Sequence, residues 1–127
     1  MKILLTGSSG FLGKYIYKSL SINNKIDTLS RNNSTYNIDL SNKIPDFKTS
    51  YNMVIHAAGK AHDQSKEAVI NKLFYKVNVL GLKKLLLGLE KIGVPSKFVF
   101  ISSVSVYGLS KGTNISESFE LLAKDDY

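Results

Sequence analysis

The sequence contains no cysteine and no tryptophan, and only two of its 127 residues are proline. Without cysteine the chain forms neither disulfides nor metal sites built from thiolates. No apolar run approaches the roughly 20 residues that cross a bilayer, and the first one stops at Thr6, which is too early for a signal peptide. We therefore expect a cytoplasmic protein with one buried core.

Acidic residues are also scarce, because ten Asp and Glu stand against 17 Lys and Arg, for a formal net charge of +7. Such a balance can indicate a nucleic-acid partner. Here Arg31 is the only arginine, and the lysines are scattered without a basic block. This distribution is typical of solvated lysines on helix faces, so we expect no nucleic-acid and no membrane partner. His56 and His62 have no carboxylate at ligand spacing, and no metal site is expected.

Short apolar runs alternate with helical stretches along the chain. Apolar residues four apart predict a helix over residues 11–20, and a second, longer helix is predicted from about 65 to 92, where a glycine and a proline follow. The buried face of the longer helix is predicted to consist of Leu73, Val77, Leu80, Gly81, Leu85, Leu89 and Ile92.

The predicted strands cover residues 2–6, 25–30, 36–40, 51–58 and 97–103. The first and the last are apolar on both faces, which is typical of a parallel sheet covered on both sides. Right-handed crossovers then lead to a doubly wound α/β sheet, in which the strands lie in the order 3-2-1-4-5.

A glycine loop connects the first predicted strand to the first predicted helix. Gly7 permits a tight turn, Gly10 lets a pyrophosphate approach the backbone, and Gly13 lets the helix pack on the strand. The free N–H groups and the dipole at the start of a helix favour a phosphate. The alternative is a turn that is merely rich in glycine, but its position between a buried strand and an amphipathic helix favours dinucleotide binding.

With Thr6 in front, the spacing Gly-x-x-Gly-x-x-Gly resembles the extended short-chain dehydrogenase/reductase family, also called NAD-dependent epimerase/dehydratase proteins. Four further segments resemble family motifs in the family's order and extend the resemblance over the whole chain: 37–40 (NIDL), 54–59 (VIHAAG), 75–81 (YKVNVLG) and 98–108 (FVFISSVSVYG). The resemblance implies an NAD(P)-binding Rossmann fold, a nicotinamide dinucleotide cofactor and a nucleotide-sugar substrate.

Two residues have alternative interpretations. By the resemblance, Asn78 positions groups near the cofactor, and otherwise it is a buried amide bonded to backbone. Lys60, just past Gly59, could reach the cofactor phosphate or the substrate, and otherwise it is an ordinary loop lysine. The full set of expected cofactor-binding residues is Gly7, Ser9, Gly10, Phe11, Leu12, Gly13, Arg31, Asp39, Leu40, Ala57, Ala58, Gly59, Lys60 and Asn78.

The residue that ends the second strand decides between NAD and NADP, because a carboxylate there binds the ribose 2′-hydroxyl and a cation accommodates a 2′-phosphate. Asp27 lies mid-strand by this count, and the strand ends at Ser30 and Arg31. The guanidinium of Arg31 suits a phosphate, so NADP is favoured over NAD. The alternative for Arg31 is an ordinary loop cation.

In the family, a Ser or Thr orients the substrate oxygen, and a Tyr with a Lys four residues later on one helix face acts as acid and base. Ser103 matches the Ser, with a strand-end serine making a local bond as the alternative. Tyr127 is placed like the catalytic Tyr. Tyr107 and Lys111 also have the required spacing, but the residues after Lys111 are poor helix formers.

The resemblance is to the N-terminal part of family members, so we expect a truncated Rossmann domain over residues 1–127 without the substrate domain that follows in the family. We therefore expect the 127-residue chain to be inactive by itself and to leave residues 99–101 uncovered at a sheet edge, which favours a homodimer or self-association. The other hypotheses are a non-catalytic NADP-sensing or interaction module of the same fold, and a nucleic-acid binder.

Overall fold

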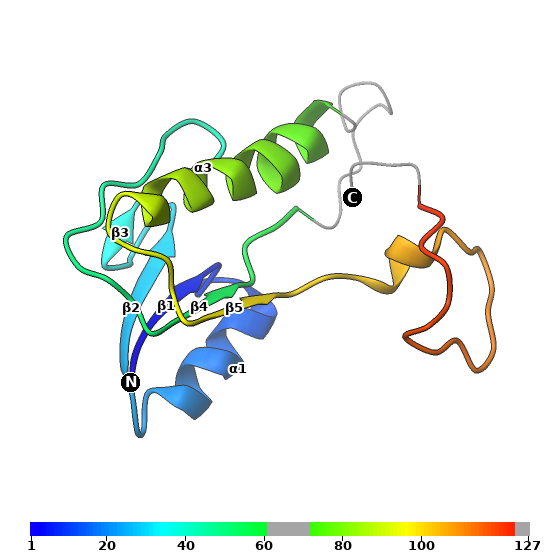
Figure 1. Cartoon of the computed structure of the whole chain (residues 1–127), viewed down its shortest axis with the longest axis horizontal. Coiled ribbons are helices and arrows are strands. Elements are labelled where there is room, and N and C mark those ends of the chain that lie inside the picture. Colours follow the sequence, from blue (N-terminus) through cyan, green and yellow to red (C-terminus); the bar gives the residue numbers. More distant parts are fainter. Residues whose placement is uncertain (61–71, 124–127) are drawn as a thin grey trace.

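The computed structural model describes residues 1–60 and 72–123 of the chain (Figure 1). Helix α1 begins at Phe11 and ends at Leu20, and α3 covers Leu80–Glu90, preceded by a π-helical turn, η1, at Tyr75–Val79. A short 3₁₀ helix, η2, covers Val104–Tyr107. The strands are β1 (Lys2–Thr6), β2 (Lys25–Ser30), β3 (Tyr36–Asn37), β4 (Met53–His56) and β5 (Lys97–Phe100).

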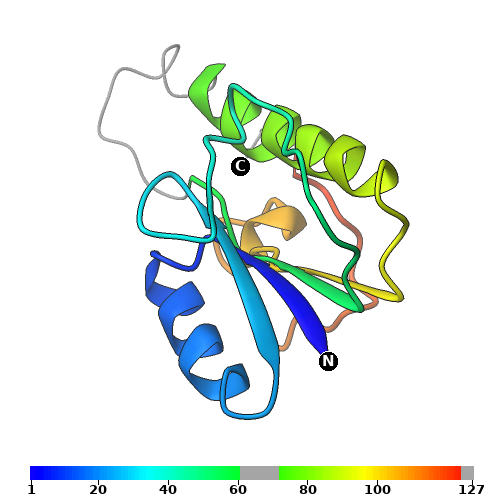
Figure 2. The same cartoon turned by 90° about the vertical axis from the view of Figure 1, so that its left-hand side faces the viewer.

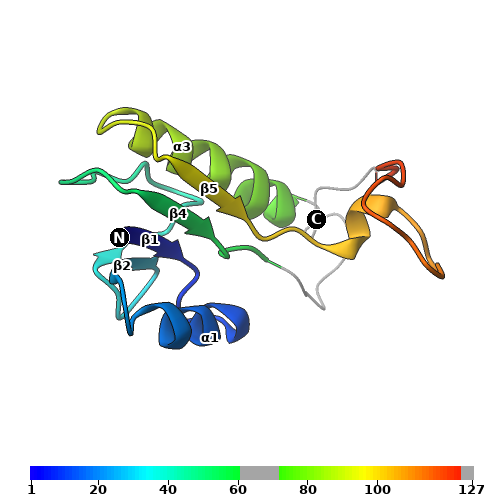
Figure 3. The same cartoon turned by 60° about the horizontal axis from the view of Figure 1, so that its bottom comes forward.

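All five strands are parallel and lie in the order β3-β2-β1-β4-β5. This confirms the strand order predicted from the sequence, which is that of the Rossmann fold. Figure 3 shows β1, β4 and β5 running side by side in one direction. Parallel alignment brings the carboxyl ends of all strands to one edge of the sheet, where ligands bind in this class of fold.

The two faces of the sheet are covered by different helices (Figure 2). Successive side chains of a strand point to opposite faces, so Ile3 and Leu5 of β1 pack with α1 residues while Leu4 packs with Leu85 and Leu89 of α3. Ile3, Leu4 and Leu5 are at most 1% exposed. The core therefore lies in two layers centred on β1, as the doubly apolar strand predicts.

Three predicted strands are shorter than expected. The third ends at Asn37 instead of Leu40, because Asp39 accepts a hydrogen bond from the backbone N–H of Ser41 at 2.9 Å and turns the chain. The fourth covers only Met53–His56, and the fifth ends at Phe100. Beyond the end of the fifth, Ser103 starts a 3₁₀ helix by accepting a hydrogen bond from the N–H of Ser105.

The long predicted helix has an unexpected π-helical turn in its described part. The turn at Tyr75–Val79 inserts extra backbone ahead of α3, and such insertions are frequent at functional sites. Leu85 and Leu89 are buried as predicted, and Gly88 is buried beside them. A Cβ at Gly88 would lie 2.8 Å from the carbonyl oxygen of Pro45, so this position has no room for a side chain. Residues 65–71 of the predicted helix lie outside the described residues.

Strand β5 lies at the edge of the sheet, and its apolar side chains are only partly covered. Phe98, Val99, Phe100 and Ile101 are 37–50% exposed. The segment that follows, 101–123, extends away from the sheet (Figure 1), where Tyr107 and Phe119 pack edge to face. The uncovered edge agrees with the expectation from the sequence. Among residues 1–60 and 72–123, no helix has the length and apolar character needed to cross a membrane.

Candidate functional site

The turn after β1 is possible only with glycine at two positions. Gly7 has φ +71°, and a Cβ there would lie 2.6 Å from the Ala57 carbonyl oxygen and from the Ala58 nitrogen. A Cβ on Gly13 would lie 2.1 Å from the carbonyl oxygen of Gly7. The turn is therefore pressed between β4 and α1, and a side chain at either position would force the backbone apart.

Helix α1 begins immediately after this turn with no side chain over its N-terminus. Gly10 is the N-cap residue and makes no side-chain capping bond. Its own N–H donates to the carbonyl of Gly7 at 3.0 Å, which closes the turn, while Ser9 and Gly10 are exposed. The first turn of the helix contains no acidic residue. The amides that open α1 therefore face the surroundings and favour a negatively charged group.

A cavity of about 370 Å³ lies over this turn at the carboxyl edge of the sheet. Phe11 and Leu12 do not line it, since they are 83% and 45% exposed on α1, and Gly13 is buried beneath the turn. The predicted cofactor residues that do line it are Gly7, Ser9, Gly10, Arg31, Asp39, Leu40, Ala57, Ala58, Gly59 and Lys60.

Arg31 stands at the end of β2, where the sequence analysis expected it. The strand ends at Ser30, and the exposed Arg31 lines the cavity. Asp27 lies four residues earlier in the strand and does not line the cavity. It accepts a hydrogen bond from the Tyr51 hydroxyl at 3.0 Å and lies 3.5 Å from the ammonium of Lys2. Arg31, and not Asp27, is thus the charged residue that β2 contributes to the cavity.

Asp39 lies on the same side of the cavity as Arg31. Burial alone would raise the pKa of Asp39, but hydrogen bonds from Ser41 and the charge of Arg31 together lower it. The amide of Asn42 adds a bond of 3.0 Å to the other carboxylate oxygen. Asp39 is therefore an ionised, well-oriented acceptor next to a cation.

Asn78 binds the backbone on the far side of the cavity. Its Oδ1 accepts a hydrogen bond from the N–H of Lys60 at 2.8 Å, and its Nδ2 donates to the carbonyl of Lys60 at 3.2 Å. The π-helical turn carries Asn78 into this position. This paired contact fixes the backbone of Lys60, so the partly buried Asn78 holds the loop that lines the cavity.

A second cavity, of about 710 Å³, lies between α3 and β5 and contains Ser103 in its wall. The hydroxyl of Ser103 accepts from the N–H of Ser105 at 3.2 Å and donates to the Ser105 hydroxyl at 3.1 Å. Helix η2 ends at Tyr107, and Gly108 with φ +65° turns the chain away. Tyr107 and Lys111 therefore do not share a helix, while Tyr127 lies outside the described residues.

His56 lines both cavities, and the sequence analysis did not assign it a role. Its Nδ1 lies 2.7 Å from the Oγ1 of Thr6, and the same oxygen accepts a hydrogen bond from the N–H of Ala58 at 3.2 Å. His56 is 3% exposed, and burial lowers its pKa to about 4. The signal in the sequence was a histidine at the end of a buried strand, but its partner Thr6 is 50 residues away.

The model of the NAD dependent epimerase/dehydratase family matches residues 3–125. The chain belongs to this family. Since the match covers nearly all of the chain, it includes the glycine turn, both cavities and the strand that leads to Ser103.

Two curated relatives and one solved structure illustrate the similarity. The chain is 30% identical over 115 residues to N-acetyl-alpha-D-glucosaminyl-diphospho-ditrans,octacis-undecaprenol 4-epimerase of Escherichia coli O157:H7, covering 86% of this chain and 34% of that protein. It is 33% identical over 143 aligned positions to UDP-glucose 4-epimerase of Vibrio cholerae, covering 98% and 42%. RMD from Pseudomonas aeruginosa complexed with NADPH superposes with a TM-score of 0.74 at 27% identity, covering 99% of this chain and 44% of that one.

The chain thus spans between about a third and under half of the length of these relatives. The matched region of this epimerase/dehydratase family member includes every predicted cofactor-binding residue. Tyr127 lies two residues beyond the end of the family match.

The buried His56 predicts an acid-sensitive fold. Its pKa of about 4 in the folded state lies below the ordinary histidine value of 6.5, so the unfolded chain takes up the proton more readily. The neutral His56 therefore contributes roughly 3 kcal/mol to the free energy of unfolding. This contribution is complete above pH 6.5 and is lost as the pH falls toward 4. Denaturant unfolding between pH 7 and pH 4.5 should show this slope, and the slope should be reduced in His56→Asn. An equal slope in both proteins would contradict the assignment.

Proposed function

We propose that this chain is the N-terminal, cofactor-binding part of an NAD(P)-dependent enzyme that modifies nucleotide sugars, as an epimerase, a dehydratase or a reductase. The observation that carries the proposal is the uncapped start of α1 behind a turn that only glycine permits, opening into a cavity with Arg31 and Asp39 on its wall. A pyrophosphate suits this start of a helix by its charge and its size.

The glycine turn is the proposed diphosphate site. Gly7 and Gly13 hold the backbone so close to its neighbours that the amides at the start of α1 are presented without intervening side chains. Lys60, whose peptide is held by Asn78, lines the same cavity and adds a positive charge. Together they would neutralise a diphosphate by hydrogen bonds and by charge.

The adenosine end would lie toward β2 and the segment after β3. Arg31 is the charged side chain at the end of β2, and its guanidinium is suited to a 2′-phosphate. Asp39 is held ionised and oriented by Ser41, and by resemblance to the family Asp39 and Leu40 would contact the adenine. We therefore favour NADP over NAD. The NADPH bound in RMD from Pseudomonas aeruginosa supports this class of cofactor.

The nicotinamide dinucleotide would supply hydride transfer to or from a sugar carbon. Ser103 would hydrogen-bond the reacting sugar oxygen, for which its hydroxyl must give up its bond to Ser105. Tyr127 would hold and release the proton of that oxygen, as the family's catalytic Tyr does. The two 4-epimerase relatives support a sugar substrate, one named with UDP-glucose and the other with a lipid-linked sugar diphosphate.

A non-catalytic NADP-sensing or interaction module is the second candidate. One observation favours this candidate. Within residues 1–60 and 72–123, Tyr107 and Lys111 have the spacing of the family's catalytic Tyr and Lys, but they do not lie on one helix. Such a module would bind the dinucleotide through the same turn and would react with no sugar. Turnover, and not binding, separates the two candidates.

The Arg31 assignment predicts a preference for NADPH. In calorimetric titrations of the full chain, NADPH should bind about tenfold more tightly than NADH, since a charge-assisted bond to phosphate is worth about that factor. Arg31→Ala should remove the preference by weakening NADPH alone. Lys91→Ala, which deletes an exposed charge after α3, is the matched control and should change neither affinity.

An unchanged preference in Arg31→Ala would remove the assignment of Arg31. Failure of the wild-type chain to bind either coenzyme at millimolar concentration would overturn the cofactor-binding proposal itself. Affinity for nucleic acid that falls steeply with salt, without coenzyme binding, would support the basic-protein alternative instead.

The catalytic assignment predicts that the 127-residue polypeptide does not turn over by itself. The 127 residues span less than half of the length of the curated relatives, and Tyr107 and Lys111 do not share a helix. An adjacent ammonium is what lowers a phenol pKa from about 10 toward neutrality. Incubation with UDP-glucose and either coenzyme, followed by chromatography of the sugar nucleotides, should show no product. Turnover comparable to that of a full-length relative would refute the prediction.

We also propose that the uncovered edge mediates self-association. Val99 is 40% exposed on the edge strand β5, where unpaired backbone groups and apolar side chains invite pairing. Light scattering at rising concentration should show mass above that of a monomer, and Val99→Lys should reduce it. Ile22→Lys, at an apolar side chain 78% exposed after α1, is the control and should have little effect. A monodisperse monomer at high concentration would contradict the proposal.

A further inference from the structure

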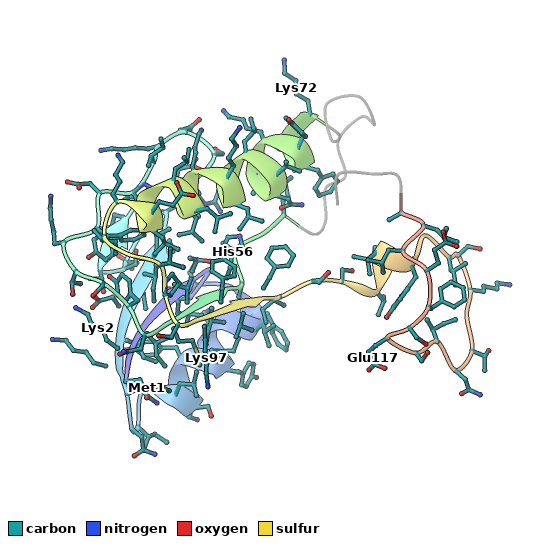
Figure 4. All side chains as sticks on the ribbon, in the orientation of Figure 1. Met1, Lys2, His56, Lys72, Lys97 and Glu117 are labelled. Atoms are coloured by element: carbon teal, nitrogen blue, oxygen red, sulfur yellow. The ribbon has the colours of Figure 1, made fainter. Side chains whose placement is uncertain are left out.

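One row of side chains connects three strands at the carboxyl edge of the sheet. Thr6 of β1 is paired in register with His56 of β4, and His56 with Phe100 of β5. The rings of His56 and Phe100 are stacked at 5.7 Å with 21° between their planes. Figure 4 shows His56 between the sheet and α3. The row therefore joins the strand before the glycine turn to the strand that leads to Ser103.

The hydrogen bonds of Thr6 determine which nitrogen of His56 carries the proton. The Thr6 hydroxyl, 0% exposed, already accepts from the N–H of Ala58. If Nδ1 of His56 also donated to it, the buried hydroxyl proton would have no acceptor, at a cost of a buried unsatisfied group. Thr6 therefore donates to Nδ1, and the imidazole is neutral with its proton on Nε2.

The rest of the ring agrees with this tautomer. Among the described residues, no buried side-chain nitrogen or oxygen is left without a partner, and the only hydrogen bond of the His56 ring to these residues is the one at Nδ1. The Nε2–H of His56 must then reach the cavities that this residue lines, where water or a ligand can accept its proton.

The Ala57–Ala58 peptide connects the Thr6–His56 pair to the glycine turn. The Thr6 hydroxyl donates its proton to His56 and accepts from the N–H of Ala58, so the bond to His56 orients the oxygen that holds this amide. The Ala57–Ala58 peptide is the surface against which Gly7 packs, with 2.6 Å between that peptide and the place of a Cβ on Gly7. A rotation of the Thr6 hydroxyl or a shift of that peptide would displace the turn.

We propose that His56 is a positioning residue for the phosphate-binding turn: as the hydrogen-bond acceptor of Thr6 it fixes the Ala57–Ala58 peptide against Gly7. The ligand of that turn rests on the function proposed above, whereas the hydrogen-bond arrangement does not. His56 touches neither phosphate nor sugar in this role. It acts through Thr6 alone.

Two pairs of variants test the arrangement. Thr6→Val keeps the shape of the side chain but removes the hydroxyl, and Thr6→Ser keeps the hydroxyl. His56→Asn retains an acceptor oxygen close to the place of Nδ1, and His56→Phe retains the ring without an acceptor. In NADPH titrations, Thr6→Val and His56→Phe should weaken binding about tenfold, while Thr6→Ser and His56→Asn should stay within about threefold of the wild type.

Nuclear magnetic resonance gives a readout that needs no coenzyme. In the ¹⁵N-labelled wild-type chain at pH 7, the His56 ring should show an unprotonated Nδ1 and a protonated Nε2, and the amide of Ala58 should exchange slowly with solvent. Its exchange should be at least tenfold faster in Thr6→Val, and the resonances of Gly7 and Gly10 should shift with it. Thermal melting of each variant separates local loosening from a loss of the fold.

The outcomes are distinct. Protonated Nδ1 in the wild type, or Ala58 exchange unchanged in Thr6→Val and His56→Phe, would overturn the positioning role even if NADPH binds well. If the wild type does not bind either coenzyme but shows the expected tautomer and the expected exchange rates, the cofactor proposal fails and the positioning of the turn stands.

Discussion

The backbone of Gly7 lies directly against the Ala57–Ala58 peptide, and the site depends on this contact. No side chain fits between the turn and β4, and none fits between Gly7 and Gly13 of α1. The turn is thereby held between α1, which follows it directly, and the Ala57–Ala58 peptide, which lies 50 residues later in the sequence. The start of α1 follows directly on this turn, and its N-cap residue, Gly10, has no side chain to bond the first amides of the helix.

The polar contacts around the turn follow one pattern, in which each side chain holds a backbone group. Thr6 accepts from the N–H of Ala58, Asp39 from that of Ser41, and Asn78 binds both backbone groups of Lys60. Loops that carry ligand-binding groups need such support, because they lack the hydrogen-bond ladder of a strand. Fixed backbone thus forms part of the cavity wall, and the charged side chains in that wall are Arg31, Asp39 and Lys60.

Much of the fold could be predicted from the sequence because the signals are local. The limits of α1 and β2 follow from apolar periodicity, and the strand order follows from parallel strands joined by helices. The short β3 could not be predicted, because the carboxylate of Asp39 competes with strand pairing. The π-helical turn before α3 has no periodic signal in the sequence either.

The site was predictable where a motif specifies backbone geometry and unpredictable where two distant side chains meet. Gly7 and Gly10 line the cavity where the spacing placed them, whereas Phe11 and Leu12 are exposed in the first turn of α1 and are not among its lining residues. The pairing of Thr6 with His56 depends on the register between β1 and β4. Register is a property of the assembled sheet, so no local pattern reveals it.

The π-helical turn lets one continuous helix serve two different surfaces. An added residue rotates everything before it by about 100° around the helix axis. Leu85 and Leu89 can therefore stay in the core while Asn78, about two turns before Leu85, reaches the loop at Lys60. Deletion of one residue from Tyr75–Val79 would restore a regular α-helix but would move Asn78 away from the Lys60 backbone. Insertions and deletions within Tyr75–Val79 are consequently constrained by the loop on the other side of the cavity, and not by the helix that contains them.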